Sequence, residues 1–288
     1  MGHKVAAVVV LYHPDHQVIE TIQSLSVQVE NVVVVINAAS DEVLKSIKKI
    51  INVALIQNSS NIGLATALNK GLEYSFGELQ ADFVQLFDQD SNPPLDFTQQ
   101  LLQEFINSKE FELACIGPKL IDLKGGDSKY EKNNSQVNIQ YPRSIPTSGT
   151  LISKEAFTKV GAMMDALFID GIDHEWCFRA YSKGLVVKVS DAVQMEHNMG
   201  DVGLNYFGQY KPIHQSSVRH YFIVRNAIYL SFLSYIPLSW RMVELIKTIR
   251  RIFVYAFVST NRLQSIRLMV KAICDGVCKK LGPIEIAN

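Results

Sequence analysis

Short hydrophobic runs alternate with segments of helical spacing along the first part of the chain. The runs that predict buried strands cover residues 5–11, 32–36, 53–56 and 83–88. The segments whose hydrophobic residues recur every three or four positions, and which therefore predict helices, cover residues 15–27, 42–51, 64–74 and 95–106. Because parallel neighbours need crossover connections, this alternation predicts an α/β protein with a doubly wound, mainly parallel sheet.

The pattern changes in the second part of the chain. A strand pair broken at Gly117 and Pro118 is expected over residues 113–123, and the polar stretch 124–146 after it is either a functional flap or a disordered loop. The further expected elements are helices at 154–160 and from residue 172, strands at 185–189 and 192–195, a glycine-rich loop, and helices at 216–235, 238–258 and 263–281. We therefore expect two domains, residues 1–214 with the sheet and residues 215–288 with helices.

The composition bounds the class of protein. With 288 residues, 48% hydrophobic and 19% charged, the chain can bury one large core or two modest ones, which excludes disordered and collagen-like classes. Its four cysteines lack metal-site spacing and suit a reducing cytosol. The apolar run 5–11 is short and has no small-residue cleavage signal, so it predicts a strand rather than a signal peptide.

The net charge of zero conceals an uneven distribution of charge. Residues 1–218 hold 17 basic and 25 acidic residues, a net charge of −8, whereas residues 219–288 hold 11 and 3, a net charge of +8. The basic tail is rich in aromatic and aliphatic residues, yet no apolar run in it reaches the roughly 20 residues that span a bilayer. This combination favours helices lying on an anionic, partly apolar surface such as lipid headgroups. The alternative is a packed helical subdomain or a dimer interface.

The strand-like run 83–88 ends in two carboxylates, Asp88 and Asp90. Ligands of open α/β sheets bind outside the carboxyl ends of strands, and a divalent cation would neutralise two neighbouring carboxylates there. Such a cation would in turn favour an anionic ligand such as a diphosphate. The alternative is an acidic turn in which Asp90 caps the following helix.

Three further features carry candidate chemistry. Small and amide side chains from Asn61 to Gly63 open the helix 64–74, where they suit either a polar ligand or simple helix capping. In the second acidic cluster (Asp170, Asp173 and Glu175), Asp173 is either a cap or a catalytic base, and Glu175 has the i,i+4 spacing for an ion pair with Arg179. His197 ends a predicted strand and is either structural or a metal ligand.

Taken in this order, these stretches resemble the inverting glycosyltransferases of family 2, which have the GT-A fold, along nearly the whole chain. The resemblance implies a nucleotide-sugar donor, a Mg²⁺ or Mn²⁺ ion held by Asp88, Asp90 and His197, and Asp173 as the general base. The residues expected on the donor side are Tyr12, Asn37, Asn61, Gly63, Asn69, Asp88 and Arg225, with Arg219 as a second candidate near the diphosphate. The residues expected on the acceptor side are Gly149, Thr150, Glu175 and Trp176.

Within the family, the pattern from Asp173 to Arg179 and the pair Arg225-Asn226 look most like bacterial rhamnosyltransferases of surface polysaccharide synthesis. Two residues depart from the family pattern. Ile36 stands where many relatives have an aspartate, and this departure affects how the pocket would recognise the base of the nucleotide. Ile172 stands where many relatives have the glutamate of a Glu-Asp pair, which leaves Asp173 as the only candidate for the catalytic general base.

The resemblance implies transfer of a deoxyhexose, L-rhamnose from dTDP-L-rhamnose, onto a lipid-linked or polysaccharide acceptor. Alternatives are another donor (UDP-galactofuranose, a UDP-hexose or GDP-mannose), a metal-dependent phosphohydrolase, or a non-catalytic sugar-nucleotide-binding protein. We expect a cytoplasmic protein, peripheral on the inner face of the bacterial plasma membrane and able to form a homo-oligomer. Nucleic acid is not an expected partner.

Overall fold

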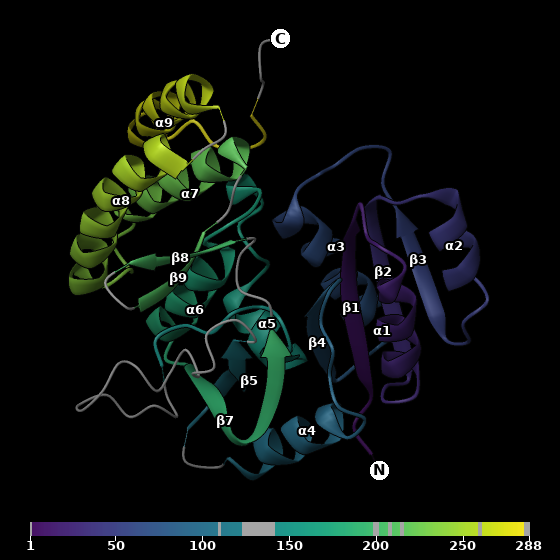
Figure 1. The fold of residues 1–288 in the computed structure, drawn as a ribbon. Helices are drawn as coiled ribbons and strands as arrows, with labels where there is room; N and C mark the ends of the chain where they lie inside the picture. The colour runs from purple at the N-terminus through teal and green to yellow at the C-terminus, as the bar shows by residue number, and fades with distance from the viewer. Residues whose placement is uncertain are drawn as a thin grey trace.

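The computed structural model describes residues 2–108, 111–122, 142–197, 202–206, 209–213, 216–258 and 261–284. Within them, the main sheet has seven strands in the order β3-β2-β1-β4-β6-β5-β7 (Figure 1). The strands are β1 (Val5–Tyr12), β2 (Asn31–Ala38), β3 (Val53–Gln57), β4 (Phe83–Asp88), β5 (Leu113–Asp122), β6 (Leu151–Ser153) and β7 (Val186–His197). All pairings are parallel except those of β6 with β4 and β5. The predicted α/β architecture with a mainly parallel sheet is confirmed.

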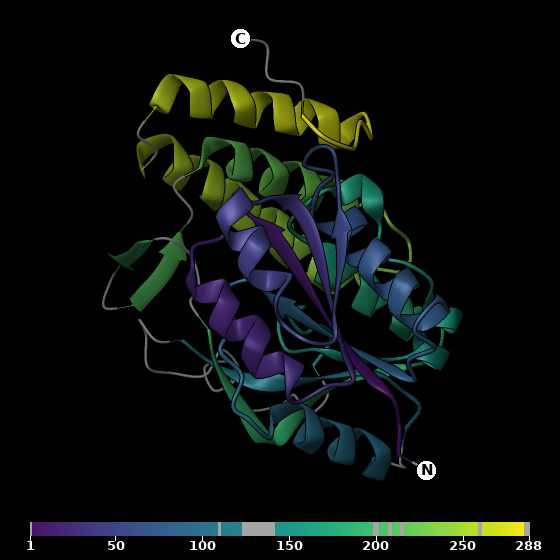
Figure 2. The same ribbon diagram turned by 90° about the vertical axis from the view of Figure 1, so that its right-hand side faces the viewer.

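Helices cover both faces of this sheet. They are α1 (Gln17–Ser26), α2 (Asp41–Ile47), α3 (Leu64–Gly77), α4 (Phe97–Asn107), α5 (Lys154–Val160) and α6 (Ile172–Ser182), with a short 3-10 helix η1 (Asp165–Leu167). Strand β1 is buried on both faces, because its even-numbered residues pack with α3 and α6 and its odd-numbered residues with α1, α2 and α4. Figure 2 shows α1 and α3 on opposite sides of the sheet.

Two segments that we expected to be broken are continuous strands. Residues 113–122 form the single strand β5, and residues 186–197 form the single strand β7. Their register shifts at Pro118, where β7 has extra residues in a bulge. Proline has no N–H donor for the ladder, so the partner strand leaves the regular register at this point. Ser190 Oγ accepts the N–H of Val193 at 2.8 Å and so satisfies a donor inside the bulge.

The glycine-rich segment after β7 was also predicted incorrectly. It contains the antiparallel pair β8 (Val202–Tyr206) and β9 (Gln209–Ile213) instead of a loop only. Val202, Leu204 and Tyr206 alternate with Gly203 and Asn205, which is strand periodicity that the glycines obscured. Most of the polar stretch 124–146, predicted as a flap or a loop, lies outside the described residues.

Three helices follow, as expected. They are α7 (Ser217–Leu230), α8 (Leu238–Val258) and α9 (Arg262–Val277). The first is shorter than predicted, because the chain turns after Leu230 and begins again beyond Pro237. Leu230 and Ile236 join the hydrophobic core that α3 and α6 share, so α7 packs directly on the sheet-containing part. No helix among the described residues is both long enough and apolar enough to cross a membrane.

Candidate functional site

The carboxyl ends of β1 and β4 are tied together beside Asp88. Gln89 accepts the Tyr12 N–H at its Oε1 (2.8 Å) and donates from its Nε2 to the Tyr12 carbonyl (3.2 Å). The Ser91 N–H donates to the Asp88 carbonyl at 3.1 Å, so the chain turns directly after the strand. These contacts fix the half-buried Asp88 at the edge of the sheet and leave Asp90 exposed.

Asp88 and Asp173 line one pocket of about 190 Å³. Asp173 reaches it from the first turn of α6, where it is half-buried and its Oδ1 accepts the His174 N–H at 2.8 Å. Thr147 lines the same pocket from the segment before β6. Two carboxylates that belong to separate sequence motifs therefore face one cavity.

Asp170 and Arg219 complete the charged lining of this pocket. The Arg219 guanidinium on α7 donates from Nη2 to Asp170 Oδ1 at 3.3 Å. Asp170 Oδ2 is buried and has no hydrogen-bond partner among the described residues. The carboxylates of Asp88, Asp170 and Asp173 outnumber the one guanidinium in this lining, so the pocket has an excess of acidic groups.

The sequence pattern predicts no role for Asp170 or for Thr147. The signal for Asp170 was present, because it lies between a predicted base and a hydrophobic run and is followed by Gly171. Phe168, Asp170 and Gly171 all have positive φ values, of 66°, 63° and 81°. Non-glycine residues in this region cost of order 1–3 kcal/mol each and cluster at functional sites.

Helix α7 holds this strained segment in place. Asn226 donates from Nδ2 to three of its carbonyls at 2.7–3.0 Å. On the other side, the Phe168 carbonyl accepts the N–H groups of Leu64 (2.7 Å) and Ala65 (3.2 Å) at the start of α3. The segment 166–171 therefore links the N-terminus of α3 to the N-terminus of α6, where Asp173 lies.

Gly63 is required for this link, and its replacement gives a testable prediction. It has a φ of +84°, and a Cβ atom there would lie 2.6 Å from the Phe168 ring and 2.8 Å from the Phe168 carbonyl oxygen. Gly63→Ala should therefore lower the free energy of unfolding by roughly 1–3 kcal/mol and reduce turnover by displacing the segment 166–171. Urea denaturation and a transfer assay would measure both, with Gly77→Ala as the control because a Cβ at Gly77 meets no atom within 4 Å. Wild-type stability and turnover in Gly63→Ala would contradict the proposed link.

Four of the residues expected on the donor side lie together at the carboxyl ends of β1 to β3. Asn37 donates from Nδ2 to the Gly63 carbonyl (3.2 Å) and accepts at Oδ1 from Asn58 Nδ2 (3.1 Å). Asn61 is exposed and accepts the Gly63 N–H at 3.0 Å. Tyr12 is 50% exposed and ends β1, next to the end of β2.

The other two donor-side residues away from the pocket have structural contacts instead. Asn69 is buried in α3, where it donates to the Met163 carbonyl (2.9 Å) and accepts the Met163 N–H (2.8 Å). Arg225 is completely buried and donates to the carbonyls of Leu167 (2.9 Å) and Gly282 (2.5 Å). Burial lowers the pKa of the Arg225 guanidinium from its ordinary value. In the structure both residues support the loop near η1.

Two of the residues expected on the acceptor side are also buried. Glu175 has no exposed surface and accepts Arg179 Nε at 2.7 Å and the Tyr235 hydroxyl at 2.6 Å. Burial lowers the pKa of Arg179, but the ion pair with Glu175 outweighs it and the net shift is upward. Burial and the hydrogen bond to Glu175 raise the pKa of Tyr235. Trp176 donates from Nε1 to the Gly161 carbonyl at 2.8 Å, so both residues anchor α6.

The remaining acceptor-side candidates, Gly149 and Thr150, lie just before β6. The Gly149 N–H donates to the Leu86 carbonyl at 2.7 Å, and Thr150 Oγ1 donates to the Pro146 carbonyl at 2.6 Å. Both residues are buried and shape the turn that presents Thr147 to the pocket. Their close approach is to a neighbouring strand, which small residues allow.

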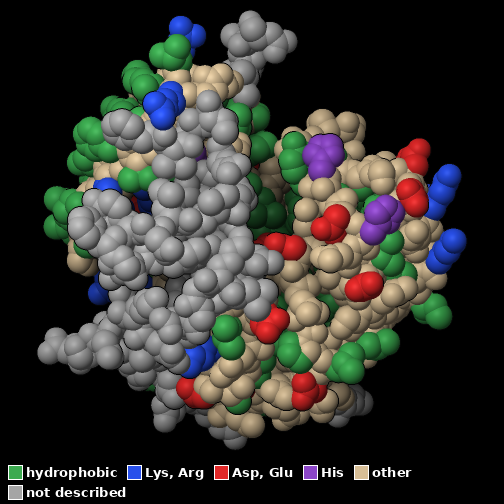
Figure 3. All heavy atoms as spheres, viewed as in Figure 1, with side chains coloured by type: hydrophobic (Ala, Val, Ile, Leu, Met, Phe, Trp, Pro, Cys, Tyr) green, Lys and Arg blue, Asp and Glu red, His purple; other side chains and the backbone are tan. Residues whose placement is uncertain are grey.

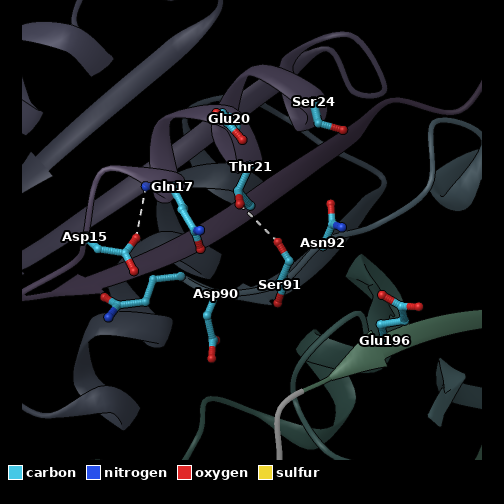
Figure 4. A pocket seen from close by; sticks show the side chains of 10 residues that line it. Asp15, Gln17, Glu20, Thr21, Ser24, Asp90, Ser91, Asn92 and Glu196 are labelled. Atoms are coloured by element: carbon cyan, nitrogen blue, oxygen red, sulfur yellow. Dashed lines mark hydrogen bonds between the residues drawn. The ribbon is translucent and has the colours of Figure 1, made fainter. Parts of the chain in front are cut away.

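Asp90 lines a different hollow from Asp88. This hollow has a volume of about 460 Å³ and contains three further carboxylates, those of Asp15, Glu20 and Glu196. Figure 4 shows Asp90 on the loop after β4, with Asp15 and Glu20 near α1 and Glu196 at the end of β7. The structure therefore does not place the two carboxylates of the Asp-x-Asp pair in one cavity.

The predicted metal ligands are close in the fold but do not form a ready-made cluster. A backbone bridge joins Asn92 to Glu196, which brings the end of β7 and the backbone of His197 beside the loop that carries Asp90. The side chain of His197 lies outside the described residues. Among the residues that are described, no three His, Cys, Asp or Glu side chains are grouped to hold a metal. The carboxylate oxygens of Asp88 and Asp90 nevertheless have the donor chemistry that Mg²⁺ and Mn²⁺ prefer.

Comparisons with known proteins agree with this architecture. Residues 7–166 match the family model described as glycosyl transferase family 2. The chain is 30% identical over 290 residues to the "dTDP-rhamnosyl transferase RfbF" of Shigella flexneri, and the match covers 96% of each chain.

Solved structures of S. aureus TarS have a similar fold. TarS 1-349 has a TM-score of 0.59 at 16% identity, covering 95% of this chain and 81% of that one. TarS 1-349 in complex with UDP-GlcNAc has a TM-score of 0.60 at 17% identity, covering 95% and 80%. At these identities the likeness shows a shared GT-A fold. With a family model matching more than half of its residues and a relative matching almost all of them, this chain belongs to glycosyl transferase family 2.

Proposed function

We propose that the protein is an inverting transferase that moves L-rhamnose from dTDP-L-rhamnose onto a lipid-linked or polysaccharide acceptor in bacterial surface polysaccharide synthesis. The choice of donor is supported by the 30% identity to a dTDP-rhamnosyl transferase over 96% of the chain. The transfer chemistry is carried by one observation, that Asp88 and Asp173 line the same pocket. Family membership supports glycosyl transfer over hydrolysis of a phosphate ester.

In this proposal Asp173 is the general base. Its carboxylate accepts the proton of the acceptor hydroxyl while that oxygen forms a bond to the anomeric carbon of the donor sugar. The bond from that carbon to the diphosphate oxygen breaks on the opposite face, which inverts the configuration and releases dTDP. Its half-buried place in the first turn of α6 gives Asp173 a fixed position beside the acceptor.

The donor would lie across the carboxyl ends of β1 to β4. Tyr12, Asn37 and Asn61 lie along this edge, where we expect them to contact the nucleoside, and Gly63 follows Asn61 at the start of α3. Arg219 lies in the pocket with 38% of its side chain exposed, so its guanidinium can donate to the diphosphate as negative charge develops there.

We also propose that Asp88, Asp90 and His197 hold Mg²⁺ or Mn²⁺ when the donor is bound. The ion would supply positive charge that stabilises the departing diphosphate. Their positions support this assignment, because Asp88 ends β4, Asp90 lies on the loop that follows it, and the end of β7 is bridged to that loop.

Removal of divalent metal should reduce turnover by roughly a hundredfold or more, because a catalytic metal supplies several kcal/mol of charge stabilisation. Titration of nucleotide release against EDTA, followed by addition of Mg²⁺ or Mn²⁺, would measure this loss and its recovery. Asp88→Asn should raise the metal concentration needed for half-maximal rate, whereas Asp82→Asn, exposed at the other end of β4, should not. Full activity in excess chelator would contradict the metal assignment.

A donor panel tests the proposed function directly. The panel contains dTDP-rhamnose, UDP-galactose, UDP-galactofuranose, UDP-N-acetylglucosamine and GDP-mannose, each scored for acceptor-dependent nucleotide release. We expect dTDP-rhamnose to be used fastest, and exclusive use of another donor would overturn the rhamnosyl assignment. A phosphate ester tests for hydrolase activity. A thermal shift with dTDP and Mn²⁺ in the absence of turnover would instead indicate a non-catalytic binding protein.

We further propose that the enzyme works in the cytoplasm as a peripheral protein at the inner face of the bacterial plasma membrane. The net charge of +8 over residues 219–288 supports this location, since the cytoplasmic leaflet is anionic. A homo-oligomer is compatible with the same transfer chemistry.

A further inference from the structure

Helix α8 carries a stripe of exposed apolar side chains from Leu238 to Phe253. Leu238, Met242, Ile246, Ile249 and Phe253 are all more than half exposed. Their spacing of three and four residues places them within about 80° of one another around the helix axis. Within the described residues, ten of the 17 exposed large hydrophobic side chains belong to α8 and α9, so this exposure is concentrated rather than scattered.

Helix α9 carries a matching stripe. Leu263, Ile266, Val270 and Val277 are exposed by 44–72%, and their spacing places them within about 60° around the axis. Figure 3 shows hydrophobic side chains gathered along the edge of the molecule that α8 and α9 form, with basic side chains beside them. Monomeric soluble proteins rarely expose a continuous apolar surface of this kind.

The other sides of the same helices are already packed within the chain, because Tyr255 of α8 and Leu268, Met269 and Ala272 of α9 lie in hydrophobic clusters. Helix α8 buries Glu244 and Thr248, and α9 buries Ser265 and Asp275. Both helices pack on the rest of the chain through these buried residues, which lie on sides of the helices away from the apolar stripes. The apolar stripes of α8 and α9 are therefore not required for packing within this chain, and they need another surface to cover them.

The exposed charges of α8, α9 and the segment after them have one sign. The exposed charged side chains among the described residues from 238 to 284 are all basic, namely Lys247, Arg250, Arg262, Arg267, Lys271, Lys279 and Lys280. The two acidic residues of this part are buried: Glu244 pairs with Arg251, and Asp275 accepts the Tyr221 hydroxyl at 2.7 Å. Arg262 and Arg267 lie about 70° to either side of the α9 stripe, so they flank it.

We propose that α8 and α9 dock the protein on an anionic lipid bilayer, with the apolar stripes at the boundary of headgroups and acyl chains and the flanking basic side chains on headgroup phosphates. Because no described helix can span a membrane, both helices would lie in the plane of the surface. A second copy of the chain is a poorer partner, since an isologous contact would set this basic face against itself. That the membrane is the one that carries the acceptor rests on the proposed function. That α8 and α9 form the docking face rests on the exposed apolar and basic side chains described above.

Vesicle flotation of the full chain, without donor or acceptor, tests the proposal. We expect binding to vesicles containing phosphatidylglycerol and about tenfold weaker binding to phosphatidylcholine alone. Ile246→Glu with Phe253→Glu should abolish binding to both, while Arg250→Glu with Arg267→Glu should remove the preference for phosphatidylglycerol. The control is Ile51→Glu, which changes an 85% exposed isoleucine beside β3 and should float like the wild type. Circular dichroism checks that every variant is folded.

Two results would overturn the proposal. One is a wild-type chain that stays with the soluble fraction in the presence of phosphatidylglycerol vesicles. The other is a dimer by light scattering that Ile246→Glu with Phe253→Glu converts to a monomer without changing vesicle binding, which would assign the face to a second copy. Failure of the transferase assignment would be distinct, because it would appear as no transfer to a soluble saccharide acceptor while vesicle binding persists.

Discussion

Replacing Asp173 with asparagine is expected to reduce the rate of sugar transfer by roughly 10²–10⁴-fold while leaving donor affinity unchanged. Asparagine has the size of aspartate and keeps an oxygen that can accept the His174 N–H, so the first turn of α6 should stay intact. An amide oxygen is too weak a base to take the proton of the acceptor hydroxyl. The measurement is kcat for transfer, together with dTDP-sugar affinity by calorimetry.

Asp41→Asn provides the matched control for this variant. Asp41 is also an aspartate in the first turn of a helix, but it is exposed on α2 and away from the pocket. It should retain wild-type turnover. Unchanged turnover in Asp173→Asn would remove the base assignment, and loss of donor binding would indicate that Asp173 holds the donor instead.

The position of the pocket followed from local sequence pattern. Asp88 could be placed because it ends a short apolar run, and the carboxyl ends of parallel strands share one edge of a sheet. Asp173 could be placed because the helical spacing after it leaves it in the first turn. In both cases the period of the element that carries the residue is enough to place it.

The roles of Arg225 and Asn226 could not be predicted in this way. An arginine and an asparagine on a helix near the site look like ligands for a diphosphate, yet here they bind carbonyls of residues 166–171. Phe168 and Asp170 in this segment adopt positive φ. Neither the backbone conformation nor the contact across more than 50 residues is encoded in the local period of α7.

The same limit explains the bulge in β7 and the buried acid on α6. The bulge in β7 lies opposite Pro118 of β5. Because this proline is on a different strand, the local pattern of residues 185–195 predicts two strands instead of one. The i,i+4 ion pair of Glu175 with Arg179, predicted from spacing, is confirmed. The complete burial of Glu175 depends on Tyr235, which follows α7. Burial is what separates a structural ion pair from an acceptor-binding carboxylate.

Glu175→Ala is therefore expected to destabilise the fold by about 3–5 kcal/mol, the usual cost of leaving one partner of a buried ion pair uncompensated. Arg179 would lose two hydrogen bonds to the carboxylate while its guanidinium stayed largely buried, and the Tyr235 hydroxyl would lose its acceptor. Urea unfolding measures the loss. Turnover per folded molecule and the KM for the acceptor should change little, because the side chain of Glu175 does not line the pocket that contains Asp173.

A second substitution separates the structural role of Glu175 from an acceptor-binding one. Glu175→Met with Arg179→Met removes the uncompensated charge, so the double variant should be more stable than Glu175→Ala. Recovery should be partial, because Arg179 also donates to the carbonyls of Val160 and Ala162 at 2.8 and 2.7 Å, and these would lose their donor. If Glu175→Ala instead kept wild-type stability and raised the KM for the acceptor, Glu175 would belong to the acceptor site. Helix α6 would then have to move during turnover to expose this side chain.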